Sequence, residues 1–273
     1  MATPKGPDPA VLRTVEEVGR GTARGLASFG FGAALVWDSL GWLLLGKKRG
    51  QTVRPQPVFS EMMEIGVRAI PIVSMLAVTI GIMLAIQGIY QLKRFGAESQ
   101  VVLGVAFGMT REFAPLITGI LVAGRSGSAL AARLGTMTIS QEIDALRVMG
   151  VNPVRFLVVP SLLAMLVMLP ALVIWADIVS LFGAGLYISA DLGMTMSSYV
   201  SQTFDLLGPE DVLHGVQKSL IFAVLITIVG IVDGASVKGG AEGVVRVTTD
   251  AVVHGITAIV LTDMVFAFAT TRV

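Results

Sequence analysis

The run AIPIVSMLAVTIGIMLAIQGIYQL, from Ala69 to Leu92, most constrains the fold because it carries no formally charged side chain. A helix needs about 20 predominantly apolar residues to cross the hydrocarbon core of a bilayer. Hydrophobic residues make up 54% of the chain and charged residues 14%, whereas a soluble domain is about 25% charged. The apolar stretches have a helical period, not the alternation of an outer-membrane barrel. The sequence therefore predicts an all-α integral membrane protein.

The remaining composition excludes several classes of function. The net charge of +1 argues against a nucleic-acid partner. The chain contains no cysteine, so disulfide and thiolate chemistry are excluded. The two histidines, His214 and His254, lie far apart and lack metal-ligand spacing, so no metal site is expected. No secretory signal is visible in Met1–Gly30, and we expect the first span to direct insertion.

Five apolar segments are candidate membrane spans. We expect them at Ala69–Leu92, in a region ending near Gly135, and at Phe156–Ala176, His214–Val232 and Thr249–Thr271. The third segment could continue past Asp177. The fifth is weaker, because Asp250 and Asp263 bracket it.

The charges between these segments predict the orientation. Five basic residues precede the first span, which by the positive-inside rule begins in the cytoplasm; they are Lys47, Lys48, Arg49, Arg54 and Arg68. The loop Ser189–Asp211 holds acidic residues and no Lys or Arg, as expected outside. With five spans, the N-terminus is then cytoplasmic and the C-terminus periplasmic.

Residues 1–55 form the predicted N-terminal amphipathic and interfacial segment. Apolar residues between Val11 and Leu26 share one helical face, which favours a helix lying on the membrane surface. The run Phe29–Gly46 contains Asp38 and two tryptophans. Because Trp favours the headgroup level, we interpret this run as an interfacial or re-entrant elbow instead of a full span.

Small residues recur every four positions along the second span, so they lie on one helix face. This ridge consists of Gly119, Ala123, Gly127, Ala131 and Gly135. A second row beside it contains Gly124, Ser128 and Ala132. Such rows let another backbone approach closely. The partner could be a helix of the same chain or a second subunit.

The same span carries four charged residues, which cost free energy inside lipid. We expect Arg133 to reach the cytoplasmic surface by snorkelling. Arg125 lies deeper and could snorkel or pair with an acidic partner. Arg111 and Glu112 are placed near the outer end of the span, either as wet headgroup residues or at the edge of a polar cavity. In the cavity interpretation, Lys218 is the plausible counter-charge.

Residues Thr138–Gly150 predict a short amphipathic helix in a cytoplasmic loop. Thr138 and Gln141 have the spacing of a capping box, and Gly150 and Pro153 end the helix. Ile139, Ile143, Leu146 and Met149 are expected on one face, with Glu142, Asp144 and Arg147 mostly elsewhere. About 16 Å of helix cannot span a bilayer. The helix could rest on the membrane or present a face to a cytoplasmic partner.

We find no catalytic constellation. Gly41–Lys48 matches the first positions of a phosphate-binding loop, but Lys48 replaces the Ser or Thr that binds magnesium, and no strand precedes it. Lys238–Gly243 is glycine-rich but too short to specify a site. The chain is therefore not expected to be an enzyme, and any ATPase must be another chain.

Glu112–Pro160 closely resembles the central sequence of the MlaE/YrbE permeases, and the resemblance continues through Lys218–Gly234 and Val247–Phe266. It covers most of the chain from about residue 60, which indicates a permease domain over residues 56–273. These permeases are membrane subunits of ABC transporters that work with MCE-domain proteins.

The resemblance implies an interfacial helix, five spans and a dimer in the bacterial inner membrane. It also implies two cytoplasmic ATPase subunits that bind ATP and Mg, an outer MCE-protein hexamer and a lipid cargo. No cofactor is expected in this chain. The family's coupling helix corresponds to Thr138–Gly150, and its cavity-lining acidic and basic residues correspond to Glu112 and Lys218.

Two other classes of function are alternatives. An ion- or proton-coupled transporter could use Asp177, Asp233 and Glu112 as a relay, but the sequence has no internal repeat or paired broken helices. The chain could also be a structural scaffold for a membrane complex.

Overall fold

The computed structural model describes residues 55–270 and positions 30, 32, 34, 35, 37–39, 41 and 42. The predicted helix within residues 1–29, the basic run 47–49 and Thr271 lie outside the described residues. All regular structure in the described part is helical. Five helical segments are long and apolar enough to cross a membrane. The predicted all-α membrane fold with five spans is therefore confirmed.

The first span is longer than predicted. Helix α2 (Pro55–Ile65) continues through the 3-10 turn η1 (Val67–Ala69) into α3 (Ile70–Lys93). Pro71 lies in the first turn of α3, where a helix tolerates a residue without an N–H. The added helix α2 carries two glutamates, Glu61 and Glu64, into the neighbourhood of the bundle.

The second span begins well before the position predicted for it. It comprises η2 (Glu98–Gln100), α4 (Val101–Phe107), η3 (Gly108–Phe113), α5 (Ala114–Val122), η4 (Ala123–Gly127) and α6 (Ser128–Ile139). The segments η3 and η4 are π-helical, and Pro115 follows η3 in the first turn of α5. The wider turns of η3 let the helix continue where a proline would break it.

This longer second span corrects the predicted depth of Arg111 and Glu112. Arg111 lies about 20 Å from Glu98 at the helical rise per residue, so the pair lies within the helix and not at its outer end. The earlier start is hard to predict from the sequence, because Ser99–Gly108 contains several residues with weak helix propensity or no side chain.

The remaining helices complete the bundle. They are α7 (Glu142–Val148), η5 (Val154–Val158), α8 (Val159–Leu192), α9 (Met196–Leu206), α10 (Pro209–Ala235) and α11 (Ala241–Thr270). Helix α8 does continue past Asp177, and it reaches into the predicted outer loop. Most of that loop is helical, because Thr195 caps α9 by accepting a hydrogen bond from the Ser198 N–H at 3.2 Å.

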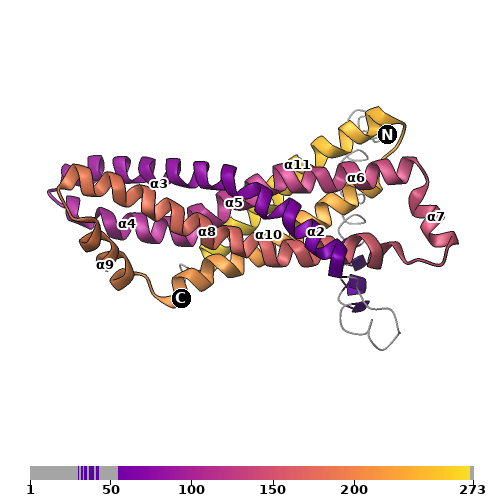
Figure 1. Ribbon diagram of the computed structural model, residues 1–273. Coiled ribbons are helices and arrows are strands. Elements are labelled where there is room, and N and C mark those ends of the chain that lie inside the picture. The colour runs from indigo at the N-terminus through magenta and orange to yellow at the C-terminus, as the bar shows by residue number, and fades with distance from the viewer. Residues whose placement is uncertain are drawn as a thin grey trace, which may run out of the picture.

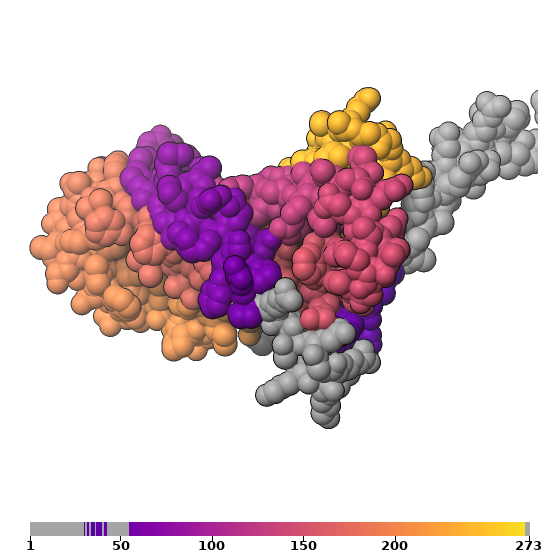
Figure 2. Space-filling model, turned by 45° about the vertical axis from the view of Figure 1, so that its right-hand side comes forward, coloured from indigo at the N-terminus to yellow at the C-terminus, as the bar shows by residue number. Residues whose placement is uncertain are grey.

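We name the two ends of the bundle after the predicted orientation, with α9 at the outer end and α7 at the inner end. Figure 1 shows α3, α4 and α8 extending past the C-terminal end of α11, with α7 at the opposite, inner end. Figure 2 shows α2 and α3 running diagonally across one face of the molecule. Helix α3 packs along α8, while α10 packs against α6, α8 and α11.

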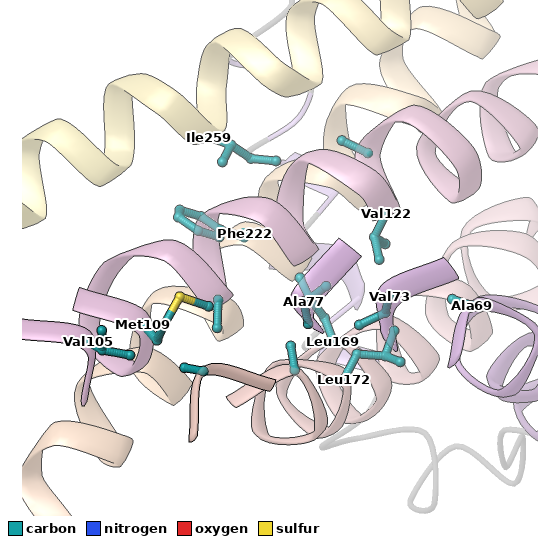
Figure 3. Packing of buried hydrophobic residues seen from close by; sticks show 14 of the residues in the cluster. Ala69, Val73, Ala77, Val105, Met109, Val122, Leu169, Leu172, Phe222 and Ile259 are labelled. Carbon is teal, nitrogen blue, oxygen red and sulfur yellow. The ribbon is translucent and has the colours of Figure 1, made fainter. Parts of the chain in front are cut away.

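The core is apolar and draws side chains from every span. Figure 3 shows Val73, Met109, Leu169, Phe222 and Ile259, from five different segments, directed toward one another. All five are at most 3% exposed. Burial of this kind leaves little room for lipid between the helices, so the bundle is a packed protein core and not a pore.

Candidate functional site

A cluster of charges lies inside the outer half of the bundle. Lys218 of α10 is completely buried, and its Nζ donates a hydrogen bond to Glu112 Oε2 at 2.5 Å. The same nitrogen lies 2.9 Å from Oδ1 of Asp263 on α11. One ammonium group therefore ties the second span to the fifth. A buried amine with two carboxylates nearby remains compensated in charge.

A second ion pair stands beside the first. Arg111 Nε donates to Oδ1 of Asp211 at 2.5 Å, and the Arg111 guanidinium lies 5.0 Å from the ring centroid of Phe107. Asp211 Oδ2 also accepts the Gly208 N–H at 2.8 Å, which caps α10. Asp211 thus connects the start of α10 to Arg111 of the second span.

These charges border an open hollow of about 680 Å³. Its polar lining comes from Arg111, Glu112, Glu210 and His214. Its other lining residues are Met264, Ala267, Phe268 and Thr270 of α11. Lys218 was predicted to lie with Arg111 and Glu112 at the cavity, but it does not line the hollow. It is buried behind the hollow wall and binds Glu112 through its ammonium group.

Asp211 and Asp263 are the members of this cluster that sequence analysis missed. It assigned Asp211 to an acidic outer loop and treated Asp263 as a weakness of the fifth span. One feature of the sequence could have indicated the role of Asp263. An aspartate within an apolar membrane helix costs free energy unless a positively charged partner lies nearby. The partner itself lies 45 residues away on another helix, as Lys218.

The small-residue ridge packs inside the chain. A Cβ on Gly119 would lie 3.0 Å from Phe222, and one on Gly127 would lie 3.1 Å from Ile226. From the other side, a Cβ on Gly230 would lie 2.9 Å from the Gly127 carbonyl oxygen. The structure therefore has the first of the two predicted alternatives, close approach of the second span (α5, η4 and α6) to α10 within one subunit. Ala123, Ala131 and Gly135 of the ridge are also buried.

The second small-residue row faces away from this contact. A Cβ on Gly124 would meet no atom within 4 Å, and Ser128 and Ala132 are partly exposed. Gly124 therefore has no close neighbour in the described part of the chain, whereas Ala132 borders a groove against the first turns of α11.

The two inner arginines are paired with α2. Arg133 forms an ion pair with Glu61 and donates from Nη2 to Ser161 Oγ at 3.1 Å. Arg125 Nη2 lies 3.5 Å from Glu64 Oε1. Arg133 therefore has an acidic partner that was not predicted for it, and Arg125 takes the pairing alternative. Sequence analysis could not find these partners because it did not recognise α2 as a helix.

The short helix between the second and third spans is smaller than predicted. Ile139 is the last residue of α6, and Gln141, with a φ of 60°, separates it from α7. The capping box is wrong, because Thr138 is still inside α6 and donates to the Leu134 carbonyl at 2.8 Å. Gly150, with a φ of 75°, follows the end of α7, as predicted.

The predicted apolar face of this helix is divided in two. Ile143 and Leu146 pack against the core formed by α6 and neighbouring segments. Val148 and Met149 are 89% and 67% exposed. The polar side chains of Glu142, Asp144 and Arg147 are exposed as well, so the outward surface is a mixture of charge and apolar area.

The three carboxylates of the relay hypothesis have different surroundings. Asp177 is buried in α8, and its Oδ1 has no hydrogen-bond partner among the described residues. Asp233 Oδ2 lies 2.9 Å from Nδ1 of His254, whereas Glu112 pairs with Lys218. Within residues 55–270 and the nearby described positions, no group of His, Asp or Glu could hold a metal ion.

Comparison with known proteins gives a consistent set of relatives. The family described as Permease MlaE matches residues 58–269. A probable ABC transporter permease protein of Rickettsia bellii is 34% identical over 215 residues, covering 77% of this chain and 83% of that protein. The intermembrane phospholipid transport system permease protein MlaE of Haemophilus influenzae is 31% identical over 224 residues, covering 78% and 84%. The chloroplastic protein TRIGALACTOSYLDIACYLGLYCEROL 1 of Arabidopsis thaliana is 34% identical over 188 residues, covering 69% and 54%.

Proposed function

Because the chain belongs to the MlaE family of ABC transporter permeases, we propose that it moves phospholipid or a related lipid between the bacterial inner membrane and an MCE-protein tunnel. The match over residues 58–269 carries this proposal. The name of the Haemophilus influenzae relative, a phospholipid transport permease, supports the lipid cargo.

The hollow at the outer end of α10 and α11 is the proposed lipid-binding surface. Arg111 and Glu112 offer a guanidinium and a carboxylate to a zwitterionic headgroup, and Met264 and Phe268 offer apolar area to an acyl chain. The buried ammonium of Lys218 restricts Glu112 to one orientation. The arrangement is therefore suited to an amphiphile and not to a bare ion.

A second copy of the chain is the proposed partner in the membrane. The apolar face of α11 is open along its length; its exposed residues include Val253, Val260, Leu261, Met264, Val265 and Phe268. This face adjoins the hollow, so a second copy here would close the hollow on its open side. Phe222 of α10 and Ile259 of α11 already lie against Gly119 of the ridge, which supports placing the second copy on α11 instead.

Transport is driven, in this proposal, by two copies of a separate cytoplasmic ATPase that binds ATP and Mg. Helix α7 is the proposed docking element, because it projects from the inner end of the bundle. Its exposed residues Val148 and Met149 would contact the ATPase. Ile143 and Leu146 would transmit the motion, because they pack against the spans.

Docking is tested by copurification of the ATPase with variants of the full chain. Val148→Asp together with Met149→Asp should abolish copurification, because both changes place charge in the proposed contact. Phe204→Asp is a matched control, because Phe204 of α9 is 78% exposed at the opposite end. Retention of a stoichiometric ATPase by the double variant would contradict docking through α7.

Lipid handling is tested in proteoliposomes that contain the permease with its ATPase and MCE partners. Glu112→Ala should reduce ATP-dependent transfer of a fluorescent phospholipid, whereas Glu98→Ala, at the start of the same span, should not. Unchanged transfer by Glu112→Ala would remove Glu112 from the proposed site. Transport by the isolated chain under a proton gradient alone would instead support the secondary-transporter alternative.

A further inference from the structure

A second polar pocket lies in the inner half of the bundle, away from the outer hollow. It has a volume of about 350 Å³ and lies between α2, the segment η4–α6 and α8. Its polar lining is formed by Ser60, Glu61, Glu64, Arg125, Ser126, Arg133 and Ser161. Polar side chains from three helices thus converge on one pocket inside an otherwise apolar bundle, which favours a bound polar ligand.

One of the two arginines that line the pocket is only weakly neutralised. Arg133 pairs with Glu61, but Arg125 Nη2 lies 3.5 Å from Glu64, which also pairs with Arg68 outside the lining. The incomplete neutralisation of Arg125 favours an anion beside it.

One donor in the pocket has no hydrogen-bond partner among the described residues. Arg125 is held in the π-helical segment η4, and its Nη1 is buried without a hydrogen bond to any described residue. Its other terminal nitrogen, Nη2, engages Glu64. Buried donors in proteins are almost always satisfied, so an unpaired one points to an unseen acceptor. Ser126, the next residue, is also buried and lines the same pocket.

The pocket lies at the level expected for the inner headgroups. Arg68 immediately precedes the uncharged run of α3, and Glu64 lies one turn further toward the cytoplasm. Leu130, which lines the pocket, clusters with Leu35 of the helical segment that contains the exposed Trp37. Trp at the end of an apolar region and Arg on the cytoplasmic side are both typical of the interface.

We propose that this pocket binds the phosphate group of a phospholipid from the cytoplasmic leaflet, with Arg125 as the principal donor. A phosphate oxygen would accept from the Arg125 guanidinium, and the hydroxyl group of Ser126 lies in the same pocket to donate a further bond. The Ser161 hydroxyl already donates to the Leu157 carbonyl at 3.1 Å. The site is distinct from the outer hollow and holds lipid at the other end of the bundle. Binding here does not depend on transport, although it would give the proposed permease a contact with inner-leaflet lipid.

The absence of cysteine from the chain provides a direct assay. Ala129→Cys places a single thiol on an exposed residue that lines the pocket. The full chain in detergent, with its copurifying partners, is alkylated with N-ethylmaleimide during titration with dioleoylphosphatidylglycerol. Dioleoylglycerol, which lacks phosphate, and inorganic phosphate are titrated in parallel.

We expect dioleoylphosphatidylglycerol to slow alkylation and dioleoylglycerol to have no effect. Arg125→Gln should raise the phosphatidylglycerol concentration for half protection about tenfold or more, because a charge-assisted hydrogen bond is lost. Arg125→Lys should need a concentration for half protection between those of the parent and Arg125→Gln, because lysine keeps the charge but lacks the planar guanidinium group. Arg246→Gln, which removes an exposed arginine of α11, should leave protection unchanged.

Each other outcome overturns part of the inference. Equal protection of Arg125→Gln and the parent, or protection by dioleoylglycerol, would show that Arg125 does not bind phosphate. Protection by inorganic phosphate at least as effective as by the lipid would assign the pocket to a free anion. No protection by either phosphate compound would leave only water in the pocket. None of these results bears on ATP-dependent transfer, so they are separable from failure of the proposed function.

Discussion

Replacing Lys218 by methionine is the most direct test of the buried charge cluster. The change keeps the length of the side chain and removes the ammonium that lies 2.5 Å from Glu112 and 2.9 Å from Asp263. Breaking a buried ion pair by removing one partner costs about 3–5 kcal/mol. The Glu112 side chain is 40% exposed and can be hydrated, whereas that of Asp263 is 15% exposed. We therefore expect a loss at the lower end of this range, about 3 kcal/mol.

The free energy of unfolding can be measured in mixed SDS micelles by circular dichroism. Lys93→Met, at the exposed outer end of α3, is the control and should change stability by no more than about 0.5 kcal/mol. Adding Asp263→Asn to Lys218→Met removes the more deeply buried orphan carboxylate and should recover more than half of the loss. The reasoning is refuted if Lys218→Met is as stable as the parent, or if the double variant is no more stable than Lys218→Met.

Two further predictions concern packing and pH. Gly234→Ala should destabilise the fold by about 1–3 kcal/mol, because the new Cβ would lie 2.7 Å from the Ala131 carbonyl oxygen. Gly124→Ala should be neutral or slightly stabilising in the same unfolding experiment, since nothing lies within 4 Å; the opposite order would contradict packing of the ridge inside the chain. Tyr199→Phe should cost about 1 kcal/mol by removing the bond to the Leu181 carbonyl at 3.0 Å. Burial raises the pKa of Tyr199, so the parent should lose stability as pH rises above about 10; a pH titration of unfolding should show this loss reduced in Tyr199→Phe.

The structure changes the interpretation of the second span. Its charges pair in two regions. Arg111 and Glu112 pair with Asp211 and Lys218 near the outer hollow, and Arg125 and Arg133 pair with α2 near the inner pocket. Between them lies the segment that packs against α10 and α11. The small side chains therefore make the close contact with α10 and α11, while the charged side chains form ion pairs with neighbouring helices. Both kinds of contact are possible because the second span faces protein over most of its length.

Helix boundaries were predicted best where a single residue imposes the conformation. Gly150 ends the α7 region because glycine adopts positive φ without the steric penalty of a side chain. Boundaries set by context were missed. Gln141 adopts positive φ against its own preference, and η3 carries the helix through to Pro115 by widening its turns.

The orientation of α7 was also not predictable from the sequence alone. The apolar period of Ile139, Ile143, Leu146 and Met149 was visible in the sequence, but a period does not say whether a face packs inward or outward. The break at Gln141 rotates Ile139 out of this face, while contact with the spans covers Ile143 and Leu146.

The sequence by itself determined the membrane class, the five spans and the family, because these follow from local hydropathy and from long uninterrupted motifs. The tertiary structure alone decided which charges pair. Lys218 and Glu112 are 106 residues apart, and Arg133 and Glu61 are 72 apart. An apolar run predicts that a segment is buried in lipid or protein, but it does not indicate which helix packs against it. A charge within that run requires a counter-charge, and only the packing of the helices brings a particular one within reach.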